Sequence, residues 1–495
     1  FWTDNGGYYH YSTGNGPMNY SVSYEELLPK VKQYHDEFGV PFRHWQFDSW
    51  FYPKDGDVAP GGGGGAVTNW TSLPDVFPSG MASIQDKLQV DMVMHNRQWS
   101  VVSDYIKNLA FEWYTSDQPG AGGAAAVPVD PEAFFAYFFQ QQKGWGLTMY
   151  EQDWMVTEYN QVAQLQTNLT LADLWLEGME EGASAAGVSI QYCMPYPHDV
   201  LKAAWLPGVT NIRASDDYFH GEDQWAIGGA ALLYDAVGVL PFKDGFYSST
   251  EVQVGGQNEG PETHPDREII MATLSTAMVG PMDGIGFLNV SRVMKSCRFD
   301  GIVLKPDRPQ KTVETCFRSG QSRSPEKCYV FETISALKGI PNPIHYFFDN
   351  DPDLTGGLIP DMLRLTETEV GAGKYVVFNW YSGNVETWEE SERPLIISPG
   401  YEGHVYAIVS PVLNWGLPTG GIAFLGEYQS KYVPCSSIRF PRVDLLPGVS
   451  RLAVVVAGVA NETVEVCVAT EAAGWSVSCE NASFDEDGTK VVRLP

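Results

Sequence analysis

The sequence has few basic residues and no long apolar segment. Its 495 residues include 31 Lys and Arg against 61 Asp and Glu, which gives a formal net charge of −30. A surface this acidic repels phosphate backbones and anionic lipid headgroups, so we expect no nucleic-acid partner. No run of about 18 apolar residues is present to span a bilayer, and we expect no insertion into a membrane.

The sequence also lacks the spaced motifs of common metal and nucleotide sites. Its seven cysteines form no C-x-x-C pair, and no H-x-H or H-x-x-x-H pair occurs. No G-K-[ST] follows the glycine run at 61–65, so this run is not a phosphate loop. We therefore predict neither a metal site nor a bound cofactor.

Several features favour a secreted, extracellular glycoprotein. The chain begins at Phe1 without a Met or an apolar leader, which is typical of a processed form. Cys316 with Cys328, and Cys467 with Cys479, would each close a short loop as a disulfide, and Cys193 is the expected free thiol. Six N-x-[ST] acceptor tripeptides occur, at Asn19, Asn69, Asn168, Asn289, Asn461 and Asn481.

Short apolar runs that end in polar residues alternate with amphipathic segments over the first 300 residues. Apolar residues recur at helical spacing in segments 24–38 and 131–142. Eight such strand and helix units predict a (β/α)8 TIM barrel. The expected strands are 1–9, 40–50, 88–97, 145–154, 187–194, 208–217, 236–244 and 282–289.

The pattern changes after residue 300. Residues 366–495 consist of short alternating strands separated by Gly, Pro and Asn, which predicts a C-terminal antiparallel β-sandwich domain. Segment 300–365, rich in Pro and Asp, is expected to complete the barrel. The predicted domains are therefore a catalytic barrel at 1–365 and a β-sandwich at 366–495.

Acidic residues concentrate at the ends of the expected strands. The active site of a TIM barrel lies at this end, and glycoside hydrolysis needs two carboxyl groups that face each other across a sugar. A single Asp at such a junction more often caps the following helix, but seven together favour a site. They are Asp4, Asp48, Glu151, Asp153, Asp216, Asp217 and Asp244, and Trp2, His95 and Cys193 are further candidates for substrate binding.

Five segments together resemble a known family. The segment IRASDDYF (212–219) resembles the RASDDF signature of raffinose synthases and alkaline α-galactosidases, which are clan D glycoside hydrolases. YEQDW (150–154) is similar to the K-x-D motif of that clan. Weaker similarities occur in FDSWF (47–51), VLKPDRPQKTVETCF (303–317) and KYVVFNWYSG (374–383), so the resemblance covers most of the chain.

The resemblance implies catalytic roles for particular residues. Asp153 matches the nucleophile that attacks the anomeric carbon. The spacing from Arg213 in R-x-x-x-D points to Asp217 as the acid/base, whereas alignment on the preceding Ser points to Asp216. We favour Asp217 and keep Asp216 as the alternative.

The resemblance also implies substrate contacts, with two departures. Asp48 matches a carboxylate that holds sugar hydroxyls, Trp50 is the expected stacking platform, and Arg213 orients hydroxyls. Ser49 replaces a second Asp of the clan, and Glu151 replaces the Lys of K-x-D. An ionised Glu accepts hydrogen bonds but donates none, so the hydroxyl pattern of galactose is not reproduced.

Together these observations predict a secreted, retaining α-glycoside hydrolase of α-galactosidase type, or a transglycosylase. It would act on an oligo- or polysaccharide through a covalent glycosyl-Asp intermediate. The alternative is a catalytically altered barrel that serves as a carbohydrate-binding or structural extracellular glycoprotein. A metal-dependent hydrolase is less favoured, because paired His ligands are lacking.

Overall fold

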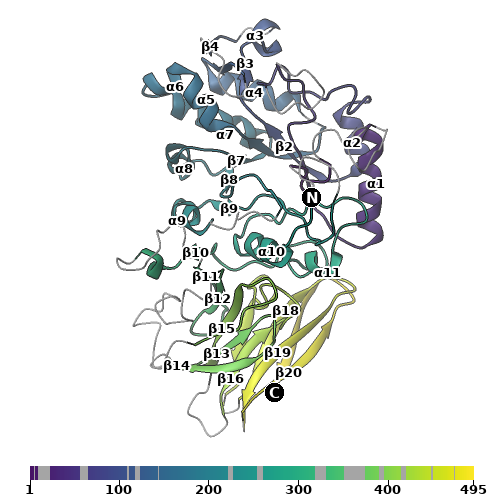
Figure 1. Cartoon of the computed structure of the whole chain (residues 1–495), viewed down its shortest axis with the longest axis vertical. Coiled ribbons are helices and arrows are strands. Elements are labelled where there is room, and N and C mark those ends of the chain that lie inside the picture. Colours follow the sequence, from purple (N-terminus) through teal and green to yellow (C-terminus); the bar gives the residue numbers. More distant parts are fainter. Residues whose placement is uncertain are drawn as a thin grey trace. The chain divides into compact units, whose positions relative to one another are not determined.

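The structure, a computed structural model, divides into two compact units (Figure 1). The first comprises Phe1–Glu222, Leu233–Pro265 and Gly280–Asn289, and the second comprises Asp223–Leu232, Asp266–Val279 and Val290–Pro495. The residues that the structure describes are 1–4, 6–8, 23–55, 65–108, 111–116, 123–142, 144–220, 227–253, 260–317, 330–350, 374–389, 395–413, 420–447, 450–472 and 474–495.

A sheet of six parallel strands forms the centre of the first unit. The strand order is β1-β2-β6-β7-β8-β9, and every neighbouring pair is parallel. Strands of such a sheet are covered on both faces, which explains their nearly continuous burial. Six of the predicted strands are thereby confirmed: β1 (His44–Phe47), β2 (Asp91–Asn96), β6 (Leu147–Gln152), β7 (Ser189–Tyr192), β8 (Val209–Arg213) and β9 (Leu240–Phe242).

The two remaining predicted strands, 1–9 and 282–289, are not assigned as strands in their described residues. Gln46 of β1 donates a backbone hydrogen bond to Phe1 O at 2.9 Å, and Trp2 N donates to Pro281 O at 3.1 Å. The segment around Pro281 bonds in turn to Phe246, which follows β9. These contacts bridge β1 and the chain after β9, while a closed eight-stranded barrel stays a prediction.

Helices follow the strands of the first unit, and the predicted helices at 24–38 and 131–142 are confirmed. In the second of these, Asp130 caps the N-terminus by accepting from Ala133 N at 3.1 Å. This helix packs closely on α7, because Gly182 brings its backbone so near that a Cβ would lie 2.7 Å from the backbone of Phe135. The described helices are α1 (Tyr24–Glu37), α2 (Met81–Leu88), α3 (Asp104–Asn108), α4 (Pro131–Gln141), α5 (Met155–Gln161), α6 (Ala163–Thr167), α7 (Leu171–Ala185), α8 (Pro197–Ala203), α9 (Gly228–Val237), α10 (Pro265–Leu274), α11 (Val290–Val293) and the 3-10 helix η1 (Glu314–Phe317).

Antiparallel sheets dominate the second unit. One runs β10-β11-β12-β15-β16-β19-β20, with β13 between β14 and β15, and a smaller one runs β17-β18-β21. Packing of the sheets as a sandwich stays a prediction. The strands are β10 (Lys311–Thr312), β11 (Val330–Ser335), β12 (Ile344–Asp349), β13 (Lys374–Asn379), β14 (Val385–Glu389), β15 (Val405–Leu413), β16 (Ile422–Gly426), β17 (Arg442–Leu445), β18 (Leu452–Gly458), β19 (Thr463–Glu471), β20 (Trp475–Ser483) and β21 (Gly488–Leu494); β3 (Trp99–Ser100), β4 (Trp113–Thr115) and β5 (Ala125–Pro128) form a small sheet in the first unit.

Segment 300–365 was predicted to complete the barrel, but its described strands lie elsewhere. Its strands β10, β11 and β12 join the antiparallel sheet, where His345 of β12 is the register partner of Val409 of β15. Strands β11 and β12, VFETIS and IHYFFD, are mostly buried and contain no Pro, and Asp349 is the last residue of β12. The predicted boundary after residue 365 lies outside the described residues and stays a prediction.

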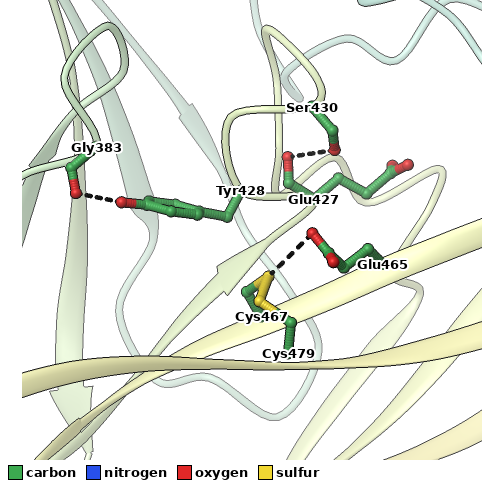
Figure 2. Close-up of a disulfide and its surroundings, with 7 residues drawn as sticks. All are labelled: Gly383, Glu427, Tyr428, Ser430, Glu465, Cys467 and Cys479. Carbon is green, nitrogen blue, oxygen red and sulfur yellow. Dashed lines mark hydrogen bonds between the residues drawn. A yellow bond between two sulfur atoms is a disulfide. The ribbon is translucent and has the colours of Figure 1, made fainter.

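One predicted disulfide is confirmed. Cys467 of β19 and Cys479 of β20 are register partners in an antiparallel pair, and their sulfurs are bonded (Figure 2). Cys328 lies outside the described residues, and with it the predicted pair with Cys316. Cys193 is a free and buried thiol, as expected.

Two further predictions concern the surface and the membrane. Among the described acceptor asparagines, Asn168, Asn461 and Asn481 are exposed, whereas Asn69 and Asn289 are partly covered. Asn19 lies outside the described residues. Glycosylation and secretion stay predictions, and no helix in the described part of the chain has the length and apolar character to span a membrane.

Candidate active site

The predicted site residues follow from the alternation of side chains along the parallel strands. Gln46 of β1 and Glu151 of β6 are hydrogen-bonded although β2 lies between their strands, so both side chains point to the concave face of the sheet. Side chains two residues further along a strand point the same way. The following residues occupy this end of the sheet: Asp48, His95, Glu151, Asp153, Cys193, Arg213, Asp217, Asp244 and, on the segment beside β1, Asp4.

Asp153 is held by hydrogen bonds on both carboxylate oxygens. Its Oδ2 lies 3.1 Å from His95 Nε2, and its Oδ1 accepts the backbone N–H of Trp154 at 2.6 Å. The other ring nitrogen of His95, Nδ1, lies 2.7 Å from the hydroxyl of Tyr52. The chain Tyr52–His95–Asp153 therefore fixes the direction in which the Asp153 carboxylate points.

Hydrogen bonds and nearby positive charge keep Asp153 ionised. Burial by itself would raise the pKa of Asp153, but the hydrogen bond and charge of His95, together with Arg213 and the Cys193 thiol, hold that pKa well below its ordinary value. Burial would lower the pKa of His95, whereas the surrounding carboxyl groups raise it. Both shifts favour an imidazolium beside a carboxylate, which suits a nucleophile that must stay charged.

Glu151 has the opposite electrostatic environment, although it lies only two residues before Asp153. Gln46 Nε2 donates to Glu151 Oε2 at 3.0 Å and to Asp48 Oδ2 at 2.8 Å. Burial raises the pKa of Glu151 to about 8, and the charges of Asp48 and Asp153 add to the shift while His95 opposes it. Glu151 is therefore an uncharged carboxylic acid at neutral pH.

Arg213 joins three carboxyl groups on the other side of the site. Its NH1 lies 3.4 Å from Asp4 Oδ2 and 3.9 Å from Asp244 Oδ2, and its NH2 donates to Asp217. One oxygen of each of these three carboxyl groups lies within 4.8 Å of the others. Since a single guanidinium faces three carboxyl groups, they share its charge.

The three carboxyl groups differ in their freedom to move. Asp244 is fully buried, and its oxygens accept the backbone N–H groups of Tyr218 and Gly245, each at 2.8 Å. Burial raises the pKa of Asp244 to about 6, and burial with the neighbouring carboxylates raises that of Asp4 well above its ordinary value. The side chain of Asp217 is 54% exposed and has the most room to reach a ligand.

Three predicted residues are placed apart from this cluster. Asp216 is exposed, and Ser215 Oγ donates to its backbone oxygen at 3.1 Å. The ring of Trp50 is 1% exposed and stacks on Tyr24 at 4.4 Å, and Trp2 is buried against Phe242. A sugar-stacking platform needs an open ring face, so we leave both tryptophans out of the proposed sugar contacts.

Three residues at this site were not predicted from the sequence. Gln46 lies two residues before Asp48, so strand alternation could have identified it. Gln191, the register partner of Glu151 on β7, is fully buried and its amide makes no hydrogen bond to the described residues. Trp154 adopts a left-handed backbone with φ 57° and packs under the guanidinium of Arg97 at 3.8 Å, which no local sequence signal indicates.

No family model and no curated protein matches the chain. Solved structures do match the chain in their fold. The GH27 β-L-arabinopyranosidase from Geobacillus stearothermophilus superposes with a TM-score of 0.51 at 11% identity, covering 84% of this chain and 97% of that chain. A variant of the same enzyme in complex with arabinose gives a TM-score of 0.52 at 10% identity, with 83% and 96% covered.

A third solved structure is less similar. A putative α-N-acetylgalactosaminidase from Bacillus halodurans gives a TM-score of 0.48 at 12% identity, covering 79% of this chain and 94% of that chain. At these identities the likeness concerns the fold. The chain therefore shares the fold of the GH27 arabinopyranosidase, which agrees with the clan D resemblance at that level.

Proposed function

We propose that this protein is a retaining glycoside hydrolase in which Asp153 is the nucleophile and Asp217 the acid/base. The observation that carries the proposal is the contrast between these carboxyl groups within one site. Asp153 is buried, doubly hydrogen-bonded and ionised beside His95, whereas Asp217 is partly exposed and can move. Retaining glycosidases need a fixed charged nucleophile and a separate proton donor.

The reaction has two steps. In the first, Asp153 forms a bond to the anomeric carbon as the glycosidic C–O bond breaks, and Asp217 transfers its proton to the departing oxygen. In the second, Asp217 takes a proton from water, whose oxygen attacks the same carbon and releases Asp153. An acceptor sugar in place of water gives transglycosylation. Because Asp217 contacts Arg213, the substrate must displace this contact before Asp217 can reach the leaving oxygen.

Asp217 suits the acid/base role better than its neighbours. Both oxygens of Asp244 accept backbone N–H groups, which fix this side chain in place. The side chain of Asp216 has no contact in the cluster around Arg213. A proton donor must reach the leaving oxygen, and the exposed fraction of Asp217 permits this movement.

The proposed substrate is a carbohydrate with an α-linked, galactose-like ring. The neighbours by fold are named for β-L-arabinopyranose, which has the ring configuration of α-D-galactopyranose without its hydroxymethyl group. Hydrogen-bonding groups crowd the site, as an array of sugar hydroxyls requires. The predicted secretion and N-glycosylation accompany this proposal, and release of N-glycans by an endoglycosidase would be visible as a mass loss.

Covalent trapping tests the proposal. The protein is incubated with 2-deoxy-2-fluoro glycosyl fluorides of the α-D-galacto and β-L-arabino configurations, and its peptides are analysed by mass spectrometry. We expect a glycosyl adduct on the peptide that contains Asp153, and none in Asp153→Asn. An adduct on another carboxyl group would overturn the assignment of the nucleophile.

A second candidate is a barrel that binds a carbohydrate without cleaving it. The pairing of Asp217 with Arg213 favours this reading, because a side chain held by Arg213 is not positioned against a leaving oxygen. Ser49 and Glu151, which depart from the resembling family, are consistent with a changed site. Binding of galactose or arabinose without turnover or adduct would support this candidate.

A further inference from the structure

We propose that Glu151 selects the substrate by donating a hydrogen bond from its Oε1 hydroxyl to a hydroxyl oxygen of an uncharged sugar. This inference rests on the proposed function and adds a specificity-determining residue to it. An ionised glutamate would accept a hydrogen bond at this position, whereas a neutral one donates. The distinction changes which sugar oxygen the site recognises and which sugars it rejects.

The orientation of the Gln46 amide determines which oxygen of Glu151 is engaged. The backbone N–H of Thr3 can only donate, and it lies 3.0 Å from Gln46 Oε1, so this atom is the amide oxygen. Gln46 Nε2 is then the donor to both Asp48 Oδ2 and Glu151 Oε2. Its two hydrogens are thereby committed, one to each carboxyl group.

This geometry leaves the other oxygen of Glu151 open. Since Oε2 already accepts from Gln46, the proton of a neutral carboxyl group belongs on Oε1. Among the described residues Oε1 takes part in no hydrogen bond, although Glu151 is only 2% exposed. An O–H donor on Oε1 that no described residue engages can bond to a ligand oxygen, which would satisfy it.

The surrounding charges explain why Glu151 holds a proton. The titratable groups that face it are Asp48 after β1, His95 on β2, Asp153 after β6 and Cys193 after β7. His95 is engaged by Asp153 and Tyr52, so its charge is directed elsewhere. With two carboxylates already present, ionisation of a third is unfavourable, and burial raises the pKa of Glu151 to about 8.

A second uncommitted polar group lies beside Glu151. Gln191 is its register partner on β7, and register partners in a parallel sheet point to the same face. Both polar atoms of the Gln191 amide are buried without a hydrogen bond to the described residues. Glu151, which donates a hydrogen bond, thus lies beside the Gln191 amide, which can both donate and accept. This combination matches sugar hydroxyls, which also donate and accept.

The charge around Glu151 and Gln191 indicates which class of sugar the site binds. A substrate carboxylate or sulfate here would face Asp48 and Asp153, and no cation of the site is free to neutralise it. The resembling family places a Lys at this position, whereas Glu151 offers a donor without a positive charge. The site should therefore take a neutral glycosyl unit and reject a uronate of the same ring configuration.

Infrared spectroscopy tests the protonation state without any ligand. We expect Glu151→Gln to remove one protonated-carboxyl C=O stretch at pH 6, and the same component to vanish from the unsubstituted protein as the pH rises through about 8. Glu158→Gln is the matched control: burial also raises the pKa of Glu158, on α5 outside the site, so this variant should remove a different component and leave the pH-dependent one of Glu151 in place. If Glu151→Gln leaves the spectrum unchanged at both pH values, the proposal is overturned.

Calorimetric binding tests the donor role. D-galactose, L-arabinose and D-galacturonate are titrated into Asp153→Asn, alone and combined with Glu151→Gln or Glu151→Leu. We expect a neutral sugar to bind, the Gln variant to keep its affinity within about threefold, and the Leu variant to lose about tenfold or more. Equal affinity in the Leu variant, stronger binding of galacturonate, or no binding by either neutral sugar would overturn the proposal. Failure of the proposed function is distinguishable, since it appears as undiminished turnover in Asp153→Asn whatever the binding result.

Discussion

Both units of the molecule bury a cluster of charged side chains, but only one cluster is balanced, in the sense that each of its carboxyl groups contacts a cation. On the concave face of the parallel sheet, six carboxyl groups meet two cationic groups, Arg213 and His95. In the second unit, Arg439 is fully buried between Glu427 and Glu462, with Nε to Glu427 Oε2 and NH1 to Glu462 Oε2 both at 2.9 Å. Its NH1 also donates to the carbonyl of Ala457.

The difference separates a site built for chemistry from one built for stability. Burying charge is unfavourable unless each charge is paired and hydrogen-bonded, and the Arg439 cluster meets this condition. The carboxyl cluster does not, and the pKa of Glu151 is raised to about 8 and that of Asp244 to about 6. Perturbed acid groups of this kind are typical of functional sites.

The largest expected effect is on catalysis in the unbalanced cluster. Asp153→Asn keeps the shape of the side chain and removes the nucleophile, so kcat for an aryl α-galactoside or β-L-arabinopyranoside should fall by about 10⁴-fold or more. The measurement is steady-state release of the chromophore. Asp216→Asn is the control and should change kcat by less than about threefold; equal losses in both variants would contradict the assignment.

The next effect is on stability in the balanced cluster. Arg439→Met leaves Glu427 and Glu462 buried without their partner and should lower the free energy of unfolding by about 3–5 kcal/mol. Urea denaturation followed by circular dichroism measures this change. Arg442→Met is the matched control: its pair with Asp444 is exposed, so the expected loss is below about 1 kcal/mol. Similar losses in the two variants would show that the buried cluster contributes no more to stability than the exposed ion pair, which would contradict the comparison.

A covalent link adds to the stability of the same region. Replacing Cys467 and Cys479 together by Ser opens a loop of 12 residues and should lower the free energy of unfolding by about 3 kcal/mol. The neighbouring register pair Thr470 and Ser476, changed together to Ala, should cost less than about 1 kcal/mol. A disulfide variant as stable as this control would show that the hairpin does not limit unfolding.

The smallest expected effect, taken per unit of pH, is a pH slope that arises from the unbalanced cluster. The folded pKa of Glu151, about 8, lies above its ordinary 4.5, so the folded state binds more protons than the unfolded state between these pH values. Stability is therefore full below pH 4.5 and declines as the pH rises towards 8, by at most about 1.4 kcal/mol per pH unit. Glu151→Gln should flatten this decline in urea titrations at several pH values. An unchanged slope would show that Glu151 ionises normally.

The sequence predicted the parts of the fold that local patterns determine. Six parallel strands were visible as apolar runs with polar ends, and position at a strand end brought Asp48, Asp153 and Asp244 together. What it missed depends on long-range contacts. The role of Gln46 requires a partner 105 residues away, and the burial of Trp50 requires Tyr24 on α1. The pairing of β12 with β15 joins segments 60 residues apart, beyond any local signal.

The hairpin in Figure 2 bears on how the protein avoids self-association. In the order of the described strands, β20 is the last, so its outer side offers backbone groups that could pair with another molecule. Six of its nine side chains are exposed, and four of these are polar, among them Glu480 and the acceptor Asn481. Because the Cys467–Cys479 bond prevents the strand from slipping in register, this polar row stays outward. Charge, a fixed register and a glycan at Asn481 would together disfavour pairing of this strand edge with another molecule.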